Sequence, residues 1–168
     1  QLDSLFFNPN GIQGEDVSAD ITGLIGLYAH GNEPSHHIAH LYNYVGEPHK
    51  TQAMLDSIIY SQYRLEPDGI AGNEDCGQMS AWYILNSMGI YQVAPGNPVF
   101  SIGRPIFDNV TIKLPEGKTF AIKTINNSRA NKYIKSVKLN GEELVSPFIN
   151  YSDIMKGGEL EIEMTDKI

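Results

Sequence analysis

Apolar residues return every three or four positions along much of the first half of the chain. This spacing is clearest over residues 50–63, where it predicts an amphipathic helix. Residues 34–45 predict a helix that begins on a proline and stops at a glycine, and residues 77–88 predict another that a glycine ends. The mostly apolar run 21–29 predicts the buried end of a further helix. The first part of the chain is therefore predicted to be helical.

The pattern changes at the turn-forming segment Pro-Gly-Asn-Pro, residues 95–98. Apolar and polar residues then alternate, which predicts β-strands with one buried face. The predicted strands cover residues 99–102, 109–114, 119–125, 133–139 and 159–164. Asn140-Gly141 between two such runs favours a type I′ hairpin turn. We predict an α+β protein, with a helical part at residues 1–97 and a small antiparallel β-sandwich or sheet at residues 98–168.

The helical part is rich in aromatic side chains. Eight tyrosine and tryptophan residues lie between positions 28 and 91, and three helices are too few to cover them. We therefore expect an incomplete piece of a larger helical assembly. The chain opens QLDSLFF, without an initiator Met or the regions of a signal peptide, so we expect a mature or truncated end. No stretch approaches the roughly 20 apolar residues of a membrane span.

Charge narrows the possible partners. The formal net charge of −8 argues against nucleic-acid binding, which needs a basic surface. Residues 1–97 hold 11 Asp and Glu against two Lys and Arg, a net of −9, whereas residues 98–168 hold nine against ten, a net of +1. An acidic part suits a divalent cation or a neutral polyol better than a phosphate, although it can also serve solubility alone. The single cysteine, Cys76, excludes an internal disulfide and a cysteine-rich metal site.

Two junctions between a loop and a helix carry the candidate chemistry. In the first, GNEPSHH at residues 31–37, a glycine turn and Pro34 present Asn32 and Glu33 at a predicted helix start. An amide oxygen beside a carboxylate makes an oxygen-only site of the kind that calcium prefers. The alternative is that Asn32 or Glu33 simply caps the helix.

The second junction, GNEDCGQMSAWY at residues 72–83, repeats the arrangement. A glycine precedes Asn73 and the adjacent acids Glu74 and Asp75, again at a helix start. Neighbouring carboxylates raise each other's pKa, which suits a proton acceptor that works near neutral pH. Here too the acids can instead cap the helix and complement its dipole.

The five histidines form a third candidate group, since all of them lie between His30 and His49. His36 and His40 are four residues apart, a spacing that can bind zinc on a helix. No glutamate follows the first histidine as in zinc proteases, and no third soft ligand is evident nearby. A hydrogen-bonding, sugar-contacting or plain core role is the alternative. Cys76 lies among acids and lacks the basic neighbours that activate a nucleophilic thiol, which argues against use as a nucleophile.

Taken together, the segments at residues 31–37 and 72–83 resemble the paired signature of the family 92 glycoside hydrolases, which are bacterial α-mannosidases. The spacing between the two segments agrees with that family. The run from Pro95 to Pro98, followed by IGRPIFD at residues 102–108, is similar to the family's exit from its helical barrel. The resemblance extends from about Asp20 to Met164, and two long motifs in register are far more specific than either alone.

The resemblance implies a fold and a chemistry. Family members have an N-terminal β-sandwich, then an (α/α)6 barrel, then a short β segment, so this chain would supply the last barrel helices and the β segment. They are exo-acting and invert the anomeric configuration, and calcium binds and distorts the mannose. By motif match, Asn32 and Glu33 would be calcium ligands and Asp75 the general base that activates water. Asn73 stands where some members have Asp, so it would orient water or sugar without accepting a proton.

The general acid of the family is a glutamate upstream, and no residue of this chain matches it. His30, Glu74 and Gln78 are further candidates for substrate binding. We expect a fragment of an exported α-mannosidase that acts on N-glycans or mannan, inactive alone and completed by the remainder of the enzyme. Contacts that set linkage preference are expected near residues 14–16 and in parts of the enzyme outside this chain. The rival hypothesis is a carbohydrate-binding module without catalysis.

Overall fold

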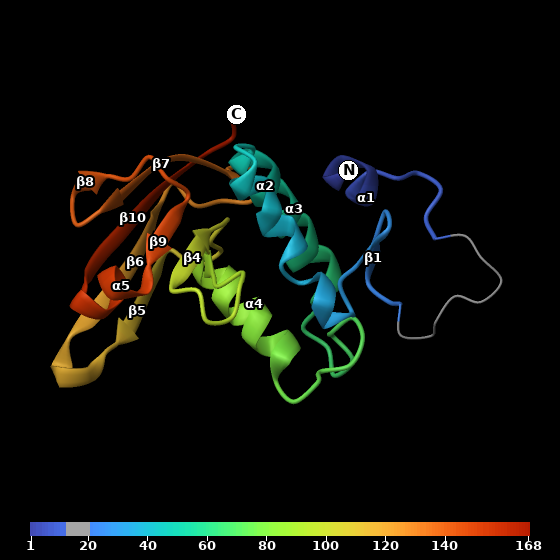
Figure 1. The fold of residues 1–168 in the computed structure, drawn as a ribbon, viewed down its shortest axis with the longest axis horizontal. Coiled ribbons are helices and arrows are strands. Elements are labelled where there is room, and N and C mark those ends of the chain that lie inside the picture. The colour runs from blue at the N-terminus through green and yellow to red at the C-terminus, as the bar shows by residue number, and fades with distance from the viewer. Residues whose placement is uncertain (13–20) are drawn as a thin grey trace.

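A computed structural model describes residues 1–12 and 21–168, and most of its helices precede most of its strands along the chain, as predicted (Figure 1). The helices are α1 (Leu2–Phe6), α2 (Leu41–Tyr44), α3 (Pro48–Gln62), α4 (Gln78–Met88) and α5 (Tyr151–Lys156). Three single 3₁₀ turns are η1 (Glu33–Ser35), η2 (Ile38–His40) and η3 (Pro115–Gly117). The α3 and α4 helices lie beside the strands and are the longest in the described part of the chain.

The strands form three sheets. The largest has the order β5-β6-β10-β7-β8, from Asn109–Lys113, Thr119–Ile125, Gly158–Thr165, Tyr133–Leu139 and Glu142–Glu143. A smaller sheet has the order β3-β4-β9, from Ile90–Tyr91, Val99–Ile102 and Phe148–Asn150. A short hairpin joins β1 (Leu24–Ile25) to β2 (Tyr28–Ala29). The α+β class is thus confirmed.

The strongest sequence patterns are confirmed almost residue for residue. Helices α3 and α4 fall on the predicted stretches 50–63 and 77–88, and Gly89 ends α4 at a φ of 91°. All five predicted strands are present, as β4, β5, β6, β7 and β10. Asn140 and Gly141 both have positive φ, at 52° and 86°, as a type I′ turn between β7 and β8 requires.

Two helix predictions are wrong. The run 21–29 forms the β1–β2 hairpin, because Gly23 and Gly26 take φ values of 65° and 62° that a helix excludes. Residues 34–45 form the 3₁₀ turns η1 and η2 and then the short helix α2. The side chains of His36 and His40 do not lie side by side on one helix face, because each hydrogen-bonds to a different part of the fold. The short elements α1, β3, β8, β9 and α5 were not predicted.

The largest sheet is not purely antiparallel, which corrects the sequence prediction. Strand β10 runs parallel to β6 and antiparallel to β7, because it is inserted between these two strands. Since β6 and β7 run in opposite directions, any strand between them must lie parallel to one of the two. Alternation of apolar residues reports which face of a strand is buried and says nothing about which neighbour it takes.

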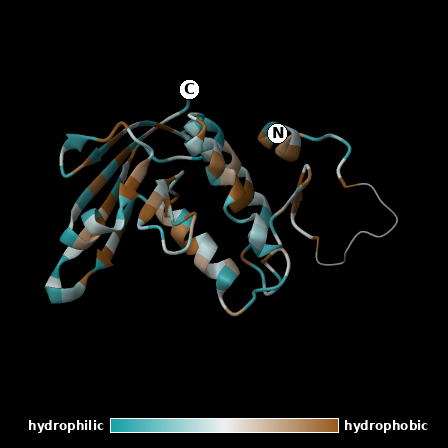
Figure 2. Ribbon diagram, in the orientation of Figure 1, coloured by the Kyte–Doolittle hydropathy of each residue, from teal (hydrophilic) through white to brown (hydrophobic). Residues whose placement is uncertain are grey.

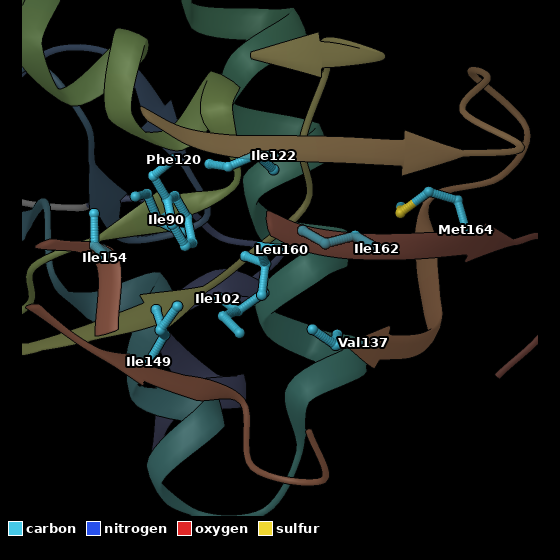
Figure 3. Packing of buried hydrophobic residues seen from close by; sticks show 10 residues of the cluster. All are labelled: Ile90, Ile102, Phe120, Ile122, Val137, Ile149, Ile154, Leu160, Ile162 and Met164. Atoms are coloured by element: carbon cyan, nitrogen blue, oxygen red, sulfur yellow. The ribbon is translucent and has the colours of Figure 1, made fainter. Parts of the chain in front are cut away.

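Two apolar cores hold the elements together. In the first, residues from one face of the large sheet pack on the β3-β4-β9 sheet and α5 (Figure 3); its buried members are Ile90, Ile102, Phe120, Ile122, Val137, Ile149, Ile154, Leu160, Ile162 and Met164. The second lies among α1, α3, α4 and the β1–β2 hairpin, with Leu55, Ile58 and Trp82 fully or almost fully buried. Figure 2 shows the strands of the large sheet alternating between apolar and polar residues.

The helical part and the β segment meet across a tight interface. Strand β3 lies before the predicted boundary at residues 95–98, but it pairs with β4, which lies after that boundary. The buried Arg104 reaches Asp56 of α3 at 3.0 Å, Nε to Oδ1. Whether residues 1–97 and 98–168 form separate domains stays a prediction, as does the helical barrel. Across the two described ranges, no helix has the length and apolar character to cross a membrane.

Candidate functional site

The two glycine-containing junctions lie against each other. A Cβ added to Gly72 would lie 2.8 Å from the carbonyl oxygen of Gly31 and 2.9 Å from its Cα, so the two backbones touch. A Cβ on Gly31 would overlap the hydroxyl of Thr22. Glycine is favoured at position 72 for a second reason, because its φ is 84°. Gly31 does not have a positive φ, so glycine is needed there only because no space is left for a side chain. Close backbone approach therefore brings together segments about 40 positions apart.

A polar pocket of about 350 Å³ opens where the junctions meet. Its walls come from the loop before β1 and from both junctions: Thr22, Gly31, Asn32, Glu33, Gly72, Asn73 and Asp75. The predicted residues Asn32, Glu33, Asn73 and Asp75 thus share one cavity. His30, Glu74 and Gln78 are not among its lining residues.

Asp75 is presented by an unusual stretch of backbone. Asp75, Cys76 and Gly77 all have positive φ, at 51°, 58° and 94°, immediately before α4. Two consecutive non-glycine residues with left-handed backbone conformations store local strain, as is common at functional sites. A hydrogen bond with Glu33 raises the pKa of Asp75, and local desolvation and the charges of Glu33 and Glu74 raise it further. Glu33 and Asp75 therefore interact directly across the pocket.

The pocket has the donors that a hard cation requires. Glu33 Oε1 and Thr22 Oγ1 are both buried and have no hydrogen-bond partner among the described residues. Asn32 and Asn73 add amide oxygens to the carboxylates of Glu33 and Asp75. An oxygen-only set of this kind, with Glu33 as its acidic member, suits Ca²⁺. Clusters of three or more His, Cys, Asp or Glu that could hold a metal are absent from residues 1–12 and 21–168.

Glu74 acts locally on α4. Its Oε1 accepts a hydrogen bond of 2.9 Å from the backbone N–H of Ser80, and its Oε2 accepts one from the N–H of Gly77. Hydrogen bonds from Ser80 and from the backbone N–H of Gly77 lower the pKa of Glu74. The carboxylate thereby satisfies N–H groups at a helix start, which is the capping role considered as its alternative. Direct contact of Glu74 with substrate stays a prediction.

His30 lies beneath the first junction and is completely buried. Its Nε2 is 2.7 Å from the Tyr63 hydroxyl, which donates its own proton to the carbonyl of Met79 at 3.2 Å. Tyr63 must therefore accept from the Nε2–H of His30, which leaves Nδ1 to accept from the Tyr28 hydroxyl at 2.8 Å. Both ring nitrogens are satisfied inside the protein. This geometry favours a positioning role for His30, and its direct contact with sugar stays a prediction.

His36 and Gln78 connect the two junctions. Gln78 Nε2 donates to His36 Nδ1 at 2.9 Å, and His36 Nε2–H donates to the carbonyl of His30 at 2.9 Å. The Trp82 indole N–H adds a bond of 3.0 Å to the carbonyl of His36. Gln78, the first residue of α4, is thus linked through a ring to the backbone just before Gly31. Gln78 is one member of this partly buried hydrogen-bond network, and its contact with substrate stays a prediction.

His40 belongs to a different network, which contradicts a zinc site built on His36 and His40. Its Nε2–H donates to Asn86 Oδ1 at 2.8 Å, and its Nδ1 lies 3.0 Å from Ser101 Oγ. The Ser101 hydroxyl also accepts from Asn43 Nδ2 at 2.7 Å. His40 therefore joins α2, α4 and β4 through neutral hydrogen bonds.

Burial of His30 and His40 predicts that stability falls in acid. Burial lowers the pKa of His30 to about 3 and that of His40 to about 4, below the ordinary value near 6.5. Above pH 6.5 both rings are neutral in the folded and unfolded states, and stability is fully present. As the pH falls toward 4, only the unfolded chain takes up protons, so each histidine removes about 2–3 kcal/mol of stability.

Urea unfolding at pH 7.5 and pH 4.5 measures this loss. His40→Gln removes one titrating ring, so the variant should start less stable and lose about 2 kcal/mol less than the parent over that interval. His49→Gln replaces a partly exposed histidine on the first turn of α3 and is the comparison variant for a histidine outside the core. Equal pH dependence in His40→Gln and parent would contradict the prediction.

Thr22 is the site residue that sequence reasoning missed. It lies outside both motifs, and a lone threonine in a mostly apolar run gives no signal. Only the backbone pairing that places Gly31 N–H 3.0 Å from the Thr22 carbonyl brings it to the pocket. The stretch 14–16, expected to contribute to linkage preference, lies outside the described residues.

Comparisons with known proteins agree with this geometry. A sequence model described as the glycosyl hydrolase family 92 catalytic domain matches residues 1–166. An uncharacterized secreted glycosidase of Arthroderma benhamiae is 34% identical over 137 residues, which is 80% of this chain and 18% of that protein. The chain thus spans about a fifth of the length of this relative.

Two solved structures from Bacteroides thetaiotaomicron are similar over 99% of this chain. A family GH92 α-mannosidase has a TM-score of 0.88 at 40% identity, with 21% of its own chain covered. A family GH92 inverting mannosidase has a TM-score of 0.81 at 35% identity, with 24% covered. The sequence match, the shared fold and the paired junctions agree, so this chain belongs to glycosyl hydrolase family 92 and corresponds to a portion of the family's catalytic domain.

Proposed function

We propose that this chain supplies the metal-binding and water-activating wall of an exo-acting, inverting, calcium-dependent α-mannosidase. The observation that carries the proposal is the shared pocket in which Glu33 and Asp75 interact. Asn32 and Glu33 would hold the cation, Asp75 would act as the general base, and Asn73 would orient water or sugar. When bound, a calcium ion would supply the positive charge that holds and orients the hydroxyls of a sugar.

The setting of Asp75 supports its assignment as the base, because an aspartate carboxylate is a proton acceptor of the kind that general-base catalysis uses. Asp75 is also exposed at the pocket, where it can reach a water molecule, whereas Glu74 is occupied by N–H groups of α4. Asn73 can hydrogen-bond to the same water but takes no proton at neutral pH.

Inverting hydrolysis needs a second carboxyl group, a general acid about 6.5–9.5 Å from the base, with water between the base and the sugar. We assign that acid to the remainder of the enzyme, whose N-terminal β-sandwich and other barrel helices would complete the sugar pocket. The proposed substrates are α-linked mannosides of N-glycans or mannan. The Bacteroides thetaiotaomicron α-mannosidase is also known in complex with mannoimidazole, which supports a mannose-type ligand. Export is proposed because one relative is named as secreted.

This assignment predicts that the 168-residue chain alone does not hydrolyse an aryl α-mannoside. The full-length enzyme should do so, releasing β-mannose as detected by proton NMR, and should lose activity with a calcium chelator and regain it with added Ca²⁺. Appreciable hydrolysis by the 168-residue chain would contradict the assignment of the acid to another part of the enzyme. Mannose binding without hydrolysis by the full-length protein would favour a carbohydrate-binding role instead.

A further inference from the structure

The Thr22 side chain occupies a specific position between the two junctions. Its Oγ1 fills the space where a side chain on Gly31 would lie, and a Cβ on Gly72 would be 3.0 Å from the same atom. The backbone around it is fixed by two hydrogen bonds of 3.0 Å, from the Gly31 N–H to the Thr22 carbonyl and from the His30 N–H to the Gly23 carbonyl. Thr22 and the loop that bears Glu33 are therefore held as one unit.

The hydroxyl of Thr22 is buried without a partner in the described part of the chain, and so is Glu33 Oε1 in the same pocket. A hydroxyl can donate to a carboxylate, yet these two oxygens do not bond to each other. A buried polar group without a partner costs free energy, so a ligand that contacts both oxygens would be bound favourably. A cation does this most simply, because it accepts lone pairs from both oxygens at once.

The charge of the pocket favours a cation over a water molecule or a sugar hydroxyl. Glu33 and Asp75 bring two carboxyl groups together, and no Lys, Arg or His is among the described residues of the lining. Hydroxyl, amide and carboxylate oxygens are all hard donors, and Ca²⁺ takes six to eight such ligands in flexible geometry. Asn32 and Glu33 alone provide too few protein oxygens for a tight site.

We infer that Thr22 Oγ1 is a third side-chain ligand of the cation held by Asn32 and Glu33. This inference rests on the proposed function, since it names one more residue of the same site. It differs from a packing role, in which Thr22 would only fill the space above the two glycines. Valine preserves the shape of threonine and removes the oxygen, so Thr22→Val separates the two roles.

Calcium affinity of the full-length enzyme, measured by isothermal titration after chelation, tests the ligand. Thr22→Val is expected to weaken calcium binding about tenfold or more, and Thr22→Ser to remain close to the parent. Melting temperatures are measured in parallel with chelator and with Ca²⁺. Without metal, Thr22→Val should be at least as stable as the parent, because it removes a buried hydroxyl that lacks a partner. With Ca²⁺, its gain in melting temperature should be smaller than that of the parent.

Thr51→Val is the matched control. The Thr51 hydroxyl is also buried, but it donates to the carbonyl of Ala39 at 3.0 Å. The variant should therefore lower the melting temperature with or without metal and leave calcium affinity unchanged. Equal calcium affinity in Thr22→Val and the parent would overturn the inference and leave the proposed function standing. No calcium binding by the parent would overturn the calcium site of the proposed function itself.

Discussion

Asp75→Asn in the full-length enzyme is expected to lower kcat by about 10²–10⁴-fold, the usual contribution of a general base. Asparagine keeps the size of the side chain and can hold a water molecule, but it cannot accept a proton. The calcium contacts assigned to Asn32 and Glu33, and the orienting role assigned to Asn73, remain in the variant. The loss should therefore appear in kcat, with calcium affinity and the affinity for a mannose-type inhibitor nearly unchanged.

Steady-state hydrolysis of an aryl α-mannoside, together with calorimetric titration of calcium, measures the two effects separately. Asp68→Asn is the matched control, since Asp68 is an exposed carboxylate in the turn between α3 and α4 and lies outside the pocket. It should retain the kcat of the parent. Equal turnover by Asp75→Asn and parent would refute the assignment of the base. A loss of calcium affinity matching the loss of kcat would instead place Asp75 among the metal ligands.

Gly72→Ala is expected to be the most disruptive single-methyl change at the site. The added Cβ meets the backbone of Gly31 at 2.8–2.9 Å, and neither partner is the flexible end of a side chain. The two junctions must then separate, which moves Asn73 and Asp75 away from Glu33. We expect a loss of about 2–4 kcal/mol in the free energy of unfolding, and loss of nearly all activity in the full-length enzyme because catalytic groups tolerate little displacement.

Gly46→Ala provides a control with nearly the same φ. Gly46 has a φ of 80°, against 84° for Gly72, and a Cβ added there has nothing within 4 Å. Its cost should be only that of a left-handed alanine, about 1–2 kcal/mol, without an effect on kcat. Urea unfolding and kcat of both variants give the comparison. If the two variants lost equal stability and both kept full activity, the close contact between Gly31 and Gly72 would not hold the site together.

The sequence alone determined the elements whose pattern is local. Helices α3 and α4 and the strands β4 to β7 and β10 follow from apolar spacing, because burial of one face is repeated along each element. The turn at Asn140-Gly141 follows from the φ values that these two residue types accept. The two motifs also identified the family, and with it the candidate metal ligands Asn32 and Glu33 and the candidate base.

The tertiary structure decided everything that depends on contacts between distant segments. Spacing in the sequence does not reveal that Gly31 and Gly72 touch, so the shared pocket and the place of Thr22 in it emerged only from the fold. For the same reason, the sequence pattern could not predict that β10 is inserted between β6 and β7. It also could not predict that His36 and His40 have separate hydrogen-bond partners. Local patterns report which face is buried, whereas the partner on that face is chosen by the packing of the whole chain.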